Sequence, residues 1–122
     1  MDKRILVVED NMLVQEVYAS ALQQLDCEVI TADDGHEAME LAHEEEPDLI
    51  IMDVMLPGVS GLDLVRNMKA DPALKDTPII VVTTMATAGD ESKVLESGAD
   101  AYLPKPIQVD KFLAAVKSIL SV

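Results

Sequence analysis

Cysteine and histidine are scarce in this 122-residue sequence, and each shortage excludes a class of site. Cys27 is the single cysteine, so the chain has neither a disulfide framework nor a cysteine-based metal site, and we expect Cys27 to be a small buried hydrophobe. His36 and His43 lack a third ligand for zinc, and we expect both to be solvated. A chain of this length can bury a core without cross-links, so residues 1–122 are predicted to form one domain.

Aromatic and basic side chains are also few. Tryptophan is absent, and Tyr18, Tyr102 and Phe112 are the only aromatic residues, so the core must be built from aliphatic side chains. Nine basic residues against 23 acidic ones give a net charge of −14. A charge of this sign is repelled by nucleic-acid phosphates and by anionic membrane surfaces, which argues against direct binding to either.

Long apolar runs are missing as well. The start of the chain, Met1 to Arg4 followed by the apolar Ile5 to Val8, is too short for the core of a signal peptide. No run approaches the roughly 20 apolar residues that a membrane-spanning helix needs. We therefore expect a cytoplasmic protein.

Short apolar runs alternate with longer stretches of helical periodicity, and this pattern dominates what the sequence does contain. The predicted strands are Ile5–Val8, Glu28–Ala32, Leu49–Met52, Ile79–Thr83 and Ala101–Leu103. Alternation of this kind is typical of a parallel sheet covered by helices on both faces. We expect an α/β fold, a doubly wound (βα)5 sandwich with a five-stranded parallel sheet of order 2-1-3-4-5.

Apolar stripes at helical spacing predict which helix faces pack on the sheet. The first stripe consists of Val14, Val17, Tyr18, Ala21, Leu22 and Leu25, and the last of Val109, Phe112, Leu113, Val116 and Leu120. Ser60 and Asp63 predict a capping box at the start of a third helix. A helix around residues 90–97 has only Val94 and Leu95 as sizeable apolar anchors, so it should dock weakly.

Polar side chains stand where four of the predicted strands end. They are Glu9 and Asp10 after the first strand, Asp53 after the third, Thr83 at the end of the fourth and Lys105 beyond the fifth. Open α/β sheets bind ligands beyond the carboxyl ends of their strands, at the point where the winding reverses. In the order 2-1-3-4-5 the first and third strands are neighbours, so we expect Asp10 and Asp53 to meet there.

Three carboxylates in one crevice disfavour ionisation unless a cation neutralises them. Mg²⁺ suits this set of hard oxygen ligands and leaves room for a phosphate, and Mn²⁺ would be able to substitute. Lys105 would pair with Asp53 at rest and with a phosphoryl oxygen afterwards, and Thr83 offers a hydroxyl donor to the same group.

Each of these residues also has an ordinary structural interpretation. Glu9 and Asp10 would favour the N-terminus of the next helix, Lys105 would be a surface lysine and Thr83 an ordinary strand residue. Asp53 is harder to explain by packing, because it directly follows four apolar residues of a central strand. The convergence of all these positions on one edge of the sheet favours a site.

The sequence resembles the receiver family of bacterial response regulators along essentially its whole length. The matching segments are Val7-Val8-Glu9-Asp10-Asn11, then Asp48-Leu49-Ile50-Ile51-Met52-Asp53 with Leu56-Pro57 and Gly61, then Thr83, and Gly98-Ala99-Asp100-Ala101-Tyr102-Leu103-Pro104-Lys105-Pro106. The order and spacing of these segments are highly specific, whereas each alone would be weak. The resemblance implies a flavodoxin-like fold.

The resemblance also implies a function and the residues that perform it. Asp53 would accept a phosphoryl group from a phosphohistidine on a sensor histidine kinase or histidine phosphotransfer protein. Glu9, Asp10, Asp53 and the backbone carbonyl of Met55 would hold Mg²⁺, with Glu9 helping through water. Lys105 and Thr83 would bind the phosphoryl oxygens, and Lys105-Pro106 would be a cis bond.

The output implied by the resemblance is a change of surface and not a catalytic turnover. Thr83 would move toward the phosphoryl group and Tyr102 would turn inward behind it. The face formed by helix four, strand five and helix five would then signal to a downstream protein. Such a domain catalyses only its own phosphorylation and a slow autodephosphorylation.

Three other interpretations compete with this one. A magnesium-dependent phosphatase of the haloacid-dehalogenase type needs a second carboxylate two residues after its nucleophile, where this chain has Met55. A flavodoxin-like flavin binder needs a phosphate loop of small and hydroxyl residues, and Glu9-Asp10 would repel that phosphate. A phosphorylation-independent interaction module is less favoured, because Asp53, Thr83 and Lys105 are all present.

Three positions depart from the pattern that is commonest in the family. Met55 and Met85 are apolar where many relatives carry side chains that help to position an attacking water, and the β-branched Thr84 stands where a small residue is usual. We hypothesise that the phosphorylated protein loses its phosphate slowly and that small-molecule phosphodonors react poorly.

Overall fold

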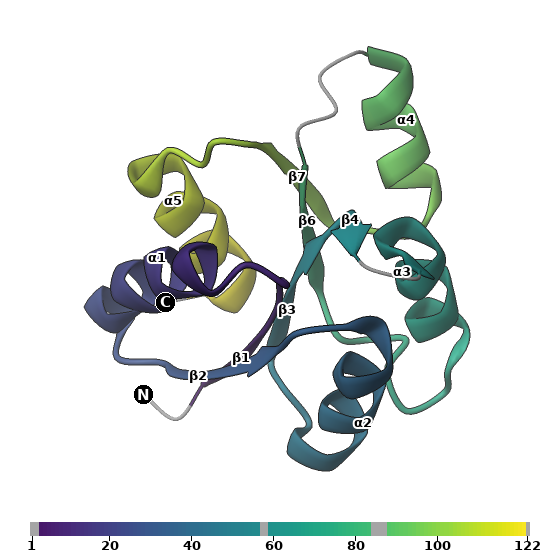
Figure 1. Cartoon of the computed structure of the whole chain (residues 1–122), viewed down its shortest axis with the longest axis horizontal. Helices are drawn as coiled ribbons and strands as arrows, with labels where there is room; N and C mark the ends of the chain where they lie inside the picture. Colours follow the sequence, from purple (N-terminus) through teal and green to yellow (C-terminus); the bar gives the residue numbers. More distant parts are fainter. Residues whose placement is uncertain (1–2, 57–58, 84–87, 122) are drawn as a thin grey trace.

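A computed structural model describes residues 3–56, 59–83 and 88–121 as a parallel sheet between two layers of helices. The five strands of the sheet are β1 (Arg4–Val8), β2 (Glu28–Ala32), β3 (Leu49–Asp53), β6 (Ile79–Thr83) and β7 (Ala101–Pro104). The helices are α1 (Met12–Leu22), α2 (Gly35–Glu45), α3 (Gly61–Ala70), α4 (Ala88–Glu96) and α5 (Val109–Leu120). Helices α1 and α5 cover one face of the sheet and α2, α3 and α4 the other (Figure 1).

The order of the sheet is β2-β1-β3-β6-β7, and every neighbouring pair is parallel. Counted along the sheet's own five strands this is 2-1-3-4-5, so the predicted doubly wound topology is confirmed. Val8 lies opposite Ala32 of β2 and Met52 of β3, which shows that β1 is paired on both sides up to its last residue. The winding reverses between β1 and β3, and the carboxyl ends of these two strands therefore meet.

A short antiparallel pair, β4 (Met55–Leu56) with β5 (Val59–Ser60), follows β3 and was not predicted. Each strand has two residues, which is too short for any hydrophobic periodicity to show in the sequence. A turn of 3₁₀ helix over Gln23–Leu25 was also not predicted. Its C-terminal cap is Asp26, whose φ of 55° lies in the left-handed region. Neither feature alters the order of the main sheet.

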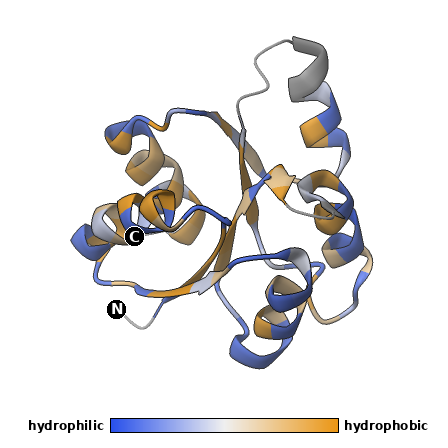
Figure 2. Ribbon diagram, viewed as in Figure 1, coloured by the Kyte–Doolittle hydropathy of each residue, from blue (hydrophilic) through white to orange (hydrophobic). Residues whose placement is uncertain are grey.

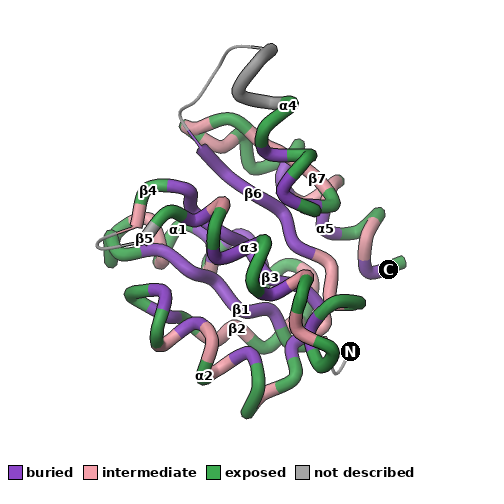
Figure 3. Tube along the Cα trace, turned by 90° about the vertical axis from the view of Figure 1, so that its right-hand side faces the viewer, coloured by how far each residue is buried: buried purple, intermediate pink, exposed green. Residues whose placement is uncertain are grey.

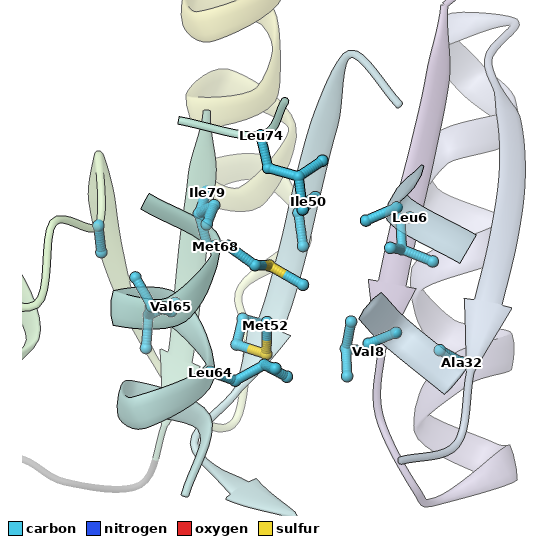
Figure 4. Close-up of a cluster of buried hydrophobic side chains, with 14 of the residues drawn as sticks. Leu6, Val8, Ala32, Ile50, Met52, Leu64, Val65, Met68, Leu74 and Ile79 are labelled. Carbon is cyan, nitrogen blue, oxygen red and sulfur yellow. The ribbon is translucent and has the colours of Figure 1, made fainter. Parts of the chain in front are cut away.

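The core consists of two aliphatic clusters, one on each face of the sheet. Figure 3 shows β6 buried along its length, and every residue of β3 and β6 is buried because helices cover both sides of these central strands. On one face, Met52 of β3 meets Leu64 and Met68 of α3 (Figure 4). On the other face, Tyr18 of α1 and Phe112 of α5 pack with ring centroids 5.3 Å apart.

Helices α1, α2 and α3 begin at side-chain caps. Asn11, Asp34 and Ser60 each accept a backbone N–H of the following first turn, which satisfies donors that the helix itself leaves without partners. The predicted cap at Ser60 is confirmed, with 3.2 Å between its Oγ and the nitrogen of Leu62. The other half of the predicted capping box, Asp63, instead binds Arg66 at 2.7 Å.

Three residues are exposed that were predicted to pack inward, Val17 and Val109 in helical stripes and Leu95 as an apolar anchor. Val17 is 45 % exposed, Val109 40 % and Leu95 48 %, so these assignments were wrong. Val17 and Val109 lie at the edge of their stripes. Both line a groove between α1 and α5 and do not pack on the sheet. With Leu95 outside, Val94 is the buried apolar residue among the described side chains of α4. Figure 2 shows that the helices carry both hydrophobic and hydrophilic residues along their length.

The histidines and the cysteine agree with their predictions only in part. His36 is exposed beside Glu40, as expected. His43 is more than a solvated residue, because its Nε2 lies 2.7 Å from Asp71 and its Nδ1 lies 2.9 Å from the carbonyl oxygen of Met39. Cys27 is half-buried, and its burial raises the pKa of the thiol. None of the helices in the described part of the chain has the length and hydropathy that crossing a bilayer requires.

Candidate functional site

The predicted site residues do gather at the carboxyl edge of the sheet. Glu9 comes directly after β1, Asp53 is the last residue of β3 and Thr83 is the last residue of β6. Their exposed fractions are 2 %, 4 % and 0 %, which is unusual for polar and charged side chains. Asp10, the next residue after Glu9, is exposed. The edge therefore carries two buried carboxylates, Glu9 and Asp53, and one solvent-exposed carboxylate, Asp10.

Lys105 connects the carboxylates of β1 and β3. Its Nζ lies 3.2 Å from Glu9 Oε2 and 3.3 Å from Asp53 Oδ1, although the residues come from three different strand ends. The backbone N–H of Lys105 also donates to the carbonyl oxygen of Thr83 at 2.8 Å, and the peptide bond to Pro106 is cis, as the resemblance implied. The lysine is thus anchored at both its backbone and its ammonium group.

Glu9, Asp10 and Asp53 together form a set of hard oxygen donors. One carboxylate oxygen from each lies within 4.8 Å of the others. The pKa of Glu9 is raised to about 7, chiefly by burial and also by the adjoining Asp53 carboxyl, while Lys105 acts to lower it. Two buried carboxyl groups this close cannot both be ionised at low cost without additional positive charge. The donor set fits a divalent cation that prefers oxygen ligands.

Backbone contacts fix the orientation of the Asp53 carboxylate. The N–H of Met55 donates to Asp53 Oδ1 at 3.1 Å, so this oxygen is held between Met55 and Lys105. Gly61 packs so closely on the end of β3 that an added Cβ would lie 2.2 Å from the carbonyl oxygen of Asp53 and 2.7 Å from the Cα of Val54. Gly61 was a motif position in the sequence, and its structural reason is this lack of room.

Two residues of the surroundings were missed by the sequence analysis. The side-chain amide of Gln15 donates to the carbonyl oxygen of Glu9 and, at 2.7 Å, to Asp33 Oδ1. Gln15 lies on the second turn of α1 and Asp33 directly follows β2. A polar residue on a helix and an acidic residue in a loop are ordinary at the sequence level, so no pattern marked either one.

The structure describes Tyr102 and Met55 but not all of the residues that were predicted to move or to surround Asp53. Tyr102 is half-buried on β7 and packs against the cluster on the α2, α3 and α4 side of the sheet. Met55, two residues after Asp53, is 68 % exposed. Thr84 and Met85 lie outside the described residues.

Replacing Gly61 with alanine tests the tight packing under Asp53. The new methyl group meets backbone atoms that cannot rotate away, so we expect Gly61→Ala to destabilise the fold by about 1–3 kcal/mol, the usual cost of overpacking. Asn67→Ala, an exposed change on the same helix, should stay within about 0.5 kcal/mol of the wild type. Urea unfolding of both variants is the measurement. Equal stabilities would show that the backbone at Asp53 leaves room for a methyl group at position 61.

Comparison with known proteins agrees with this geometry. The family model described as response regulator receiver domain matches residues 5–117. The polar-differentiation response regulator DivK of Brucella anthropi is 41 % identical over 120 residues, which cover 98 % of both chains. A putative response regulator from Chloroflexus aurantiacus has a TM-score of 0.93 and 31 % identity, with full coverage of both chains.

A second solved structure with the same fold is that of a kinase receiver domain. The receiver domain of the sensor histidine kinase PA1611 from Pseudomonas aeruginosa has a TM-score of 0.89 and 30 % identity with full coverage of both chains, and its description states that a magnesium ion is coordinated in the active-site cleft. The match of the family model covers most of the chain, and the relatives match it from end to end. This chain belongs to the receiver-domain family of two-component response regulators.

Proposed function

We propose that Asp53 accepts a phosphoryl group from a phosphohistidine on a sensor histidine kinase or a histidine phosphotransfer protein. The observation that carries the proposal is the buried Asp53 carboxylate, 3.3 Å from Lys105 Nζ and within 4.8 Å of the carboxylate oxygens of Glu9 and Asp10. A carboxylate oxygen of Asp53 attacks phosphorus, the P–N bond breaks, and the imidazole nitrogen keeps the electron pair and takes up a proton. An acyl phosphate on Asp53 results.

Glu9, Asp10, Asp53 and the backbone carbonyl of Met55 are the proposed ligands of Mg²⁺, with Glu9 contributing through water and Mn²⁺ able to substitute. Bound there, the cation would neutralise the negative charge that gathers as phosphate meets three carboxylates. The raised pKa of Glu9 is consistent with this assignment, because burial and the adjoining Asp53 carboxyl both disfavour its negative charge and a cation would offset that. The magnesium described for the PA1611 receiver domain supports it from a relative.

Lys105 and Thr83 are the proposed partners of the phosphoryl oxygens. Lys105 is held in place by its backbone bond to Thr83, so its ammonium group needs little reorganisation to move from Asp53 to a phosphoryl oxygen. Thr83 ends β6 next to this lysine and carries a hydroxyl group that can donate.

The proposed output is a change at Thr83 and Tyr102 that is transmitted to the face formed by α4, β7 and α5. Phosphorylation adds a charge of about −1.5 to −2, which favours whichever arrangement brings donors toward the phosphate. Among the described side chains of α4, Val94 is the buried apolar anchor, and elements with few buried contacts are the ones that shift most readily. The net charge of −14 supports a protein as the downstream partner, without direct contact to nucleic acid or membrane.

The assignment of Asp53 is tested by phosphotransfer. Radiolabelled histidine kinases and phosphotransfer proteins are mixed with the wild type in the presence of Mg²⁺, and the labelled protein is separated by gel electrophoresis. We expect Asp53→Asn to lose the label, because an amide cannot form the acyl phosphate. The control Asp76→Asn, an exposed carboxylate in the loop before β6, should be labelled like the wild type. Equal labelling of Asp53→Asn would refute the assignment.

The lifetime of the phosphate tests the role of Met55. A thioether is a poor hydrogen-bonding partner for water, whereas an amide at this exposed position can orient a water toward the phosphorus. We expect Met55→Asn to shorten the lifetime several-fold after the donor is removed, and Thr84→Ala to speed both loss of phosphate and reaction with acetyl phosphate. Met12→Asn, an equally exposed methionine on α1, is the control. Unchanged rates in both variants would contradict the hypothesis.

A further inference from the structure

The side chain of Gln15 bridges two loops at the edge of the sheet. Its Nε2 donates to the carbonyl oxygen of Glu9 and to Asp33 Oδ1, the latter at 2.7 Å. A carbonyl and a carboxylate can only accept, so the nitrogen of the amide must be the atom between them. The orientation of the Gln15 side chain is therefore fixed by its partners.

The carbonyl that Gln15 binds belongs to the peptide unit joining Glu9 to Asp10, two of the three clustered carboxylates. On the other side of Glu9, its N–H donates to the carbonyl oxygen of Ala32 at 3.0 Å. The backbone of Glu9 is thus held at its N–H by the end of β2 and at its C=O by α1. Strands β1 and β2, which supply the two loops, run side by side (Figure 1).

Asp33 is itself held in place. It directly follows Ala32, and its N–H donates to Glu37 Oε1 of α2 at 3.3 Å. The β2–α2 loop therefore presents a positioned carboxylate to Gln15. The chain of contacts runs from α2 through Asp33 and Gln15 to the peptide that carries Glu9 and Asp10.

We propose that Gln15 is a positioning residue for the magnesium site, and that Asp33 orients it. Clamping the Glu9–Asp10 peptide restricts the directions in which the two carboxylates leave the backbone. Groups that orient metal ligands without touching the metal typically contribute a factor of about 10–100 in metal affinity. The inference rests on the proposed magnesium site of Glu9, Asp10 and Asp53. It adds that α1 and the β2–α2 loop hold that site in position.

Calorimetric titration of the metal-free protein with MgCl₂ tests the role of Gln15. Gln15→Leu keeps the approximate size of the side chain and removes the donor, so we expect the Kd for Mg²⁺ to rise about tenfold. Gln24→Leu makes the same chemical change at an exposed glutamine away from the carboxylates and should bind like the wild type. Urea unfolding without metal is measured in parallel, and we expect similar midpoints for the two leucine variants.

Variants of Asp33 test whether this carboxylate orients Gln15. Asp33→Asn keeps an oxygen that accepts from Gln15 and should stay within a few-fold of the wild-type Kd, whereas Asp33→Ala should weaken Mg²⁺ binding by less than Gln15→Leu does. The double variant Gln15→Leu with Asp33→Ala should bind like Gln15→Leu alone, because Asp33 acts through Gln15.

The outcomes separate the inference from the proposed function. If the wild type binds Mg²⁺ and Gln15→Leu binds it equally well, or loses stability without losing affinity, Gln15 has a structural role only and the inference is overturned. If the wild type itself binds no Mg²⁺, the proposed site fails and the inference with it. Additive effects of the Gln15 and Asp33 changes would remove Asp33 from the proposal while leaving the role of Gln15.

Discussion

The ammonium group of Lys105 between Glu9 and Asp53 is the interaction on which the candidate site depends. It sets one positive charge against two buried carboxylates, with the third carboxylate of Asp10 close by. Burial of such groups costs free energy that the attraction within the cluster only partly offsets. The two aliphatic clusters on either side of the sheet supply the stability that tolerates this cost. The cluster is therefore better explained by function than by stability.

The fold follows closely from the sequence because its main signals are strong and local. Uninterrupted apolar runs in β3 and β6 are typical of central parallel strands, and both strands are buried throughout. Once the order 2-1-3-4-5 holds, the carboxyl ends of β1 and β3 must be neighbours, so Asp10 and Asp53 meet as predicted. The prediction of the site thus depended on topology more than on any single residue.

The predictions that failed concern features set by tertiary packing. A helical stripe gives the direction of the buried face but not its width, so Val17 and Val109 at its margins were assigned to the core and instead line a groove. The strands β4 and β5 are too short to leave a pattern. Gln15 and Asp33 meet only because the fold brings α1 beside the β2–α2 loop, and their residue types are common on exposed surfaces.

The support of the site is distributed over the fold. The tight approach of Gly61 fixes the end of β3 from one side, and the bond from Lys105 to Thr83 ties β7 to β6 on the other. Gln15 reaches the same edge from α1. The ends of β3, β6 and β7 are thus anchored by backbone contacts, as expected of a preorganised site for the proposed cation and phosphate.

The central claim is that the carboxylate cluster exists to hold a cation, and the free energy of unfolding of the wild type and Asp10→Asn, with and without Mg²⁺, tests it most directly. Without metal, Asp10→Asn should be at least as stable as the wild type, because it removes one of three like charges. With Mg²⁺ at about 100 times its Kd, the wild type should gain about 2.7 kcal/mol and Asp10→Asn much less. A variant that is less stable without metal and gains as much from Mg²⁺ as the wild type would contradict the claim.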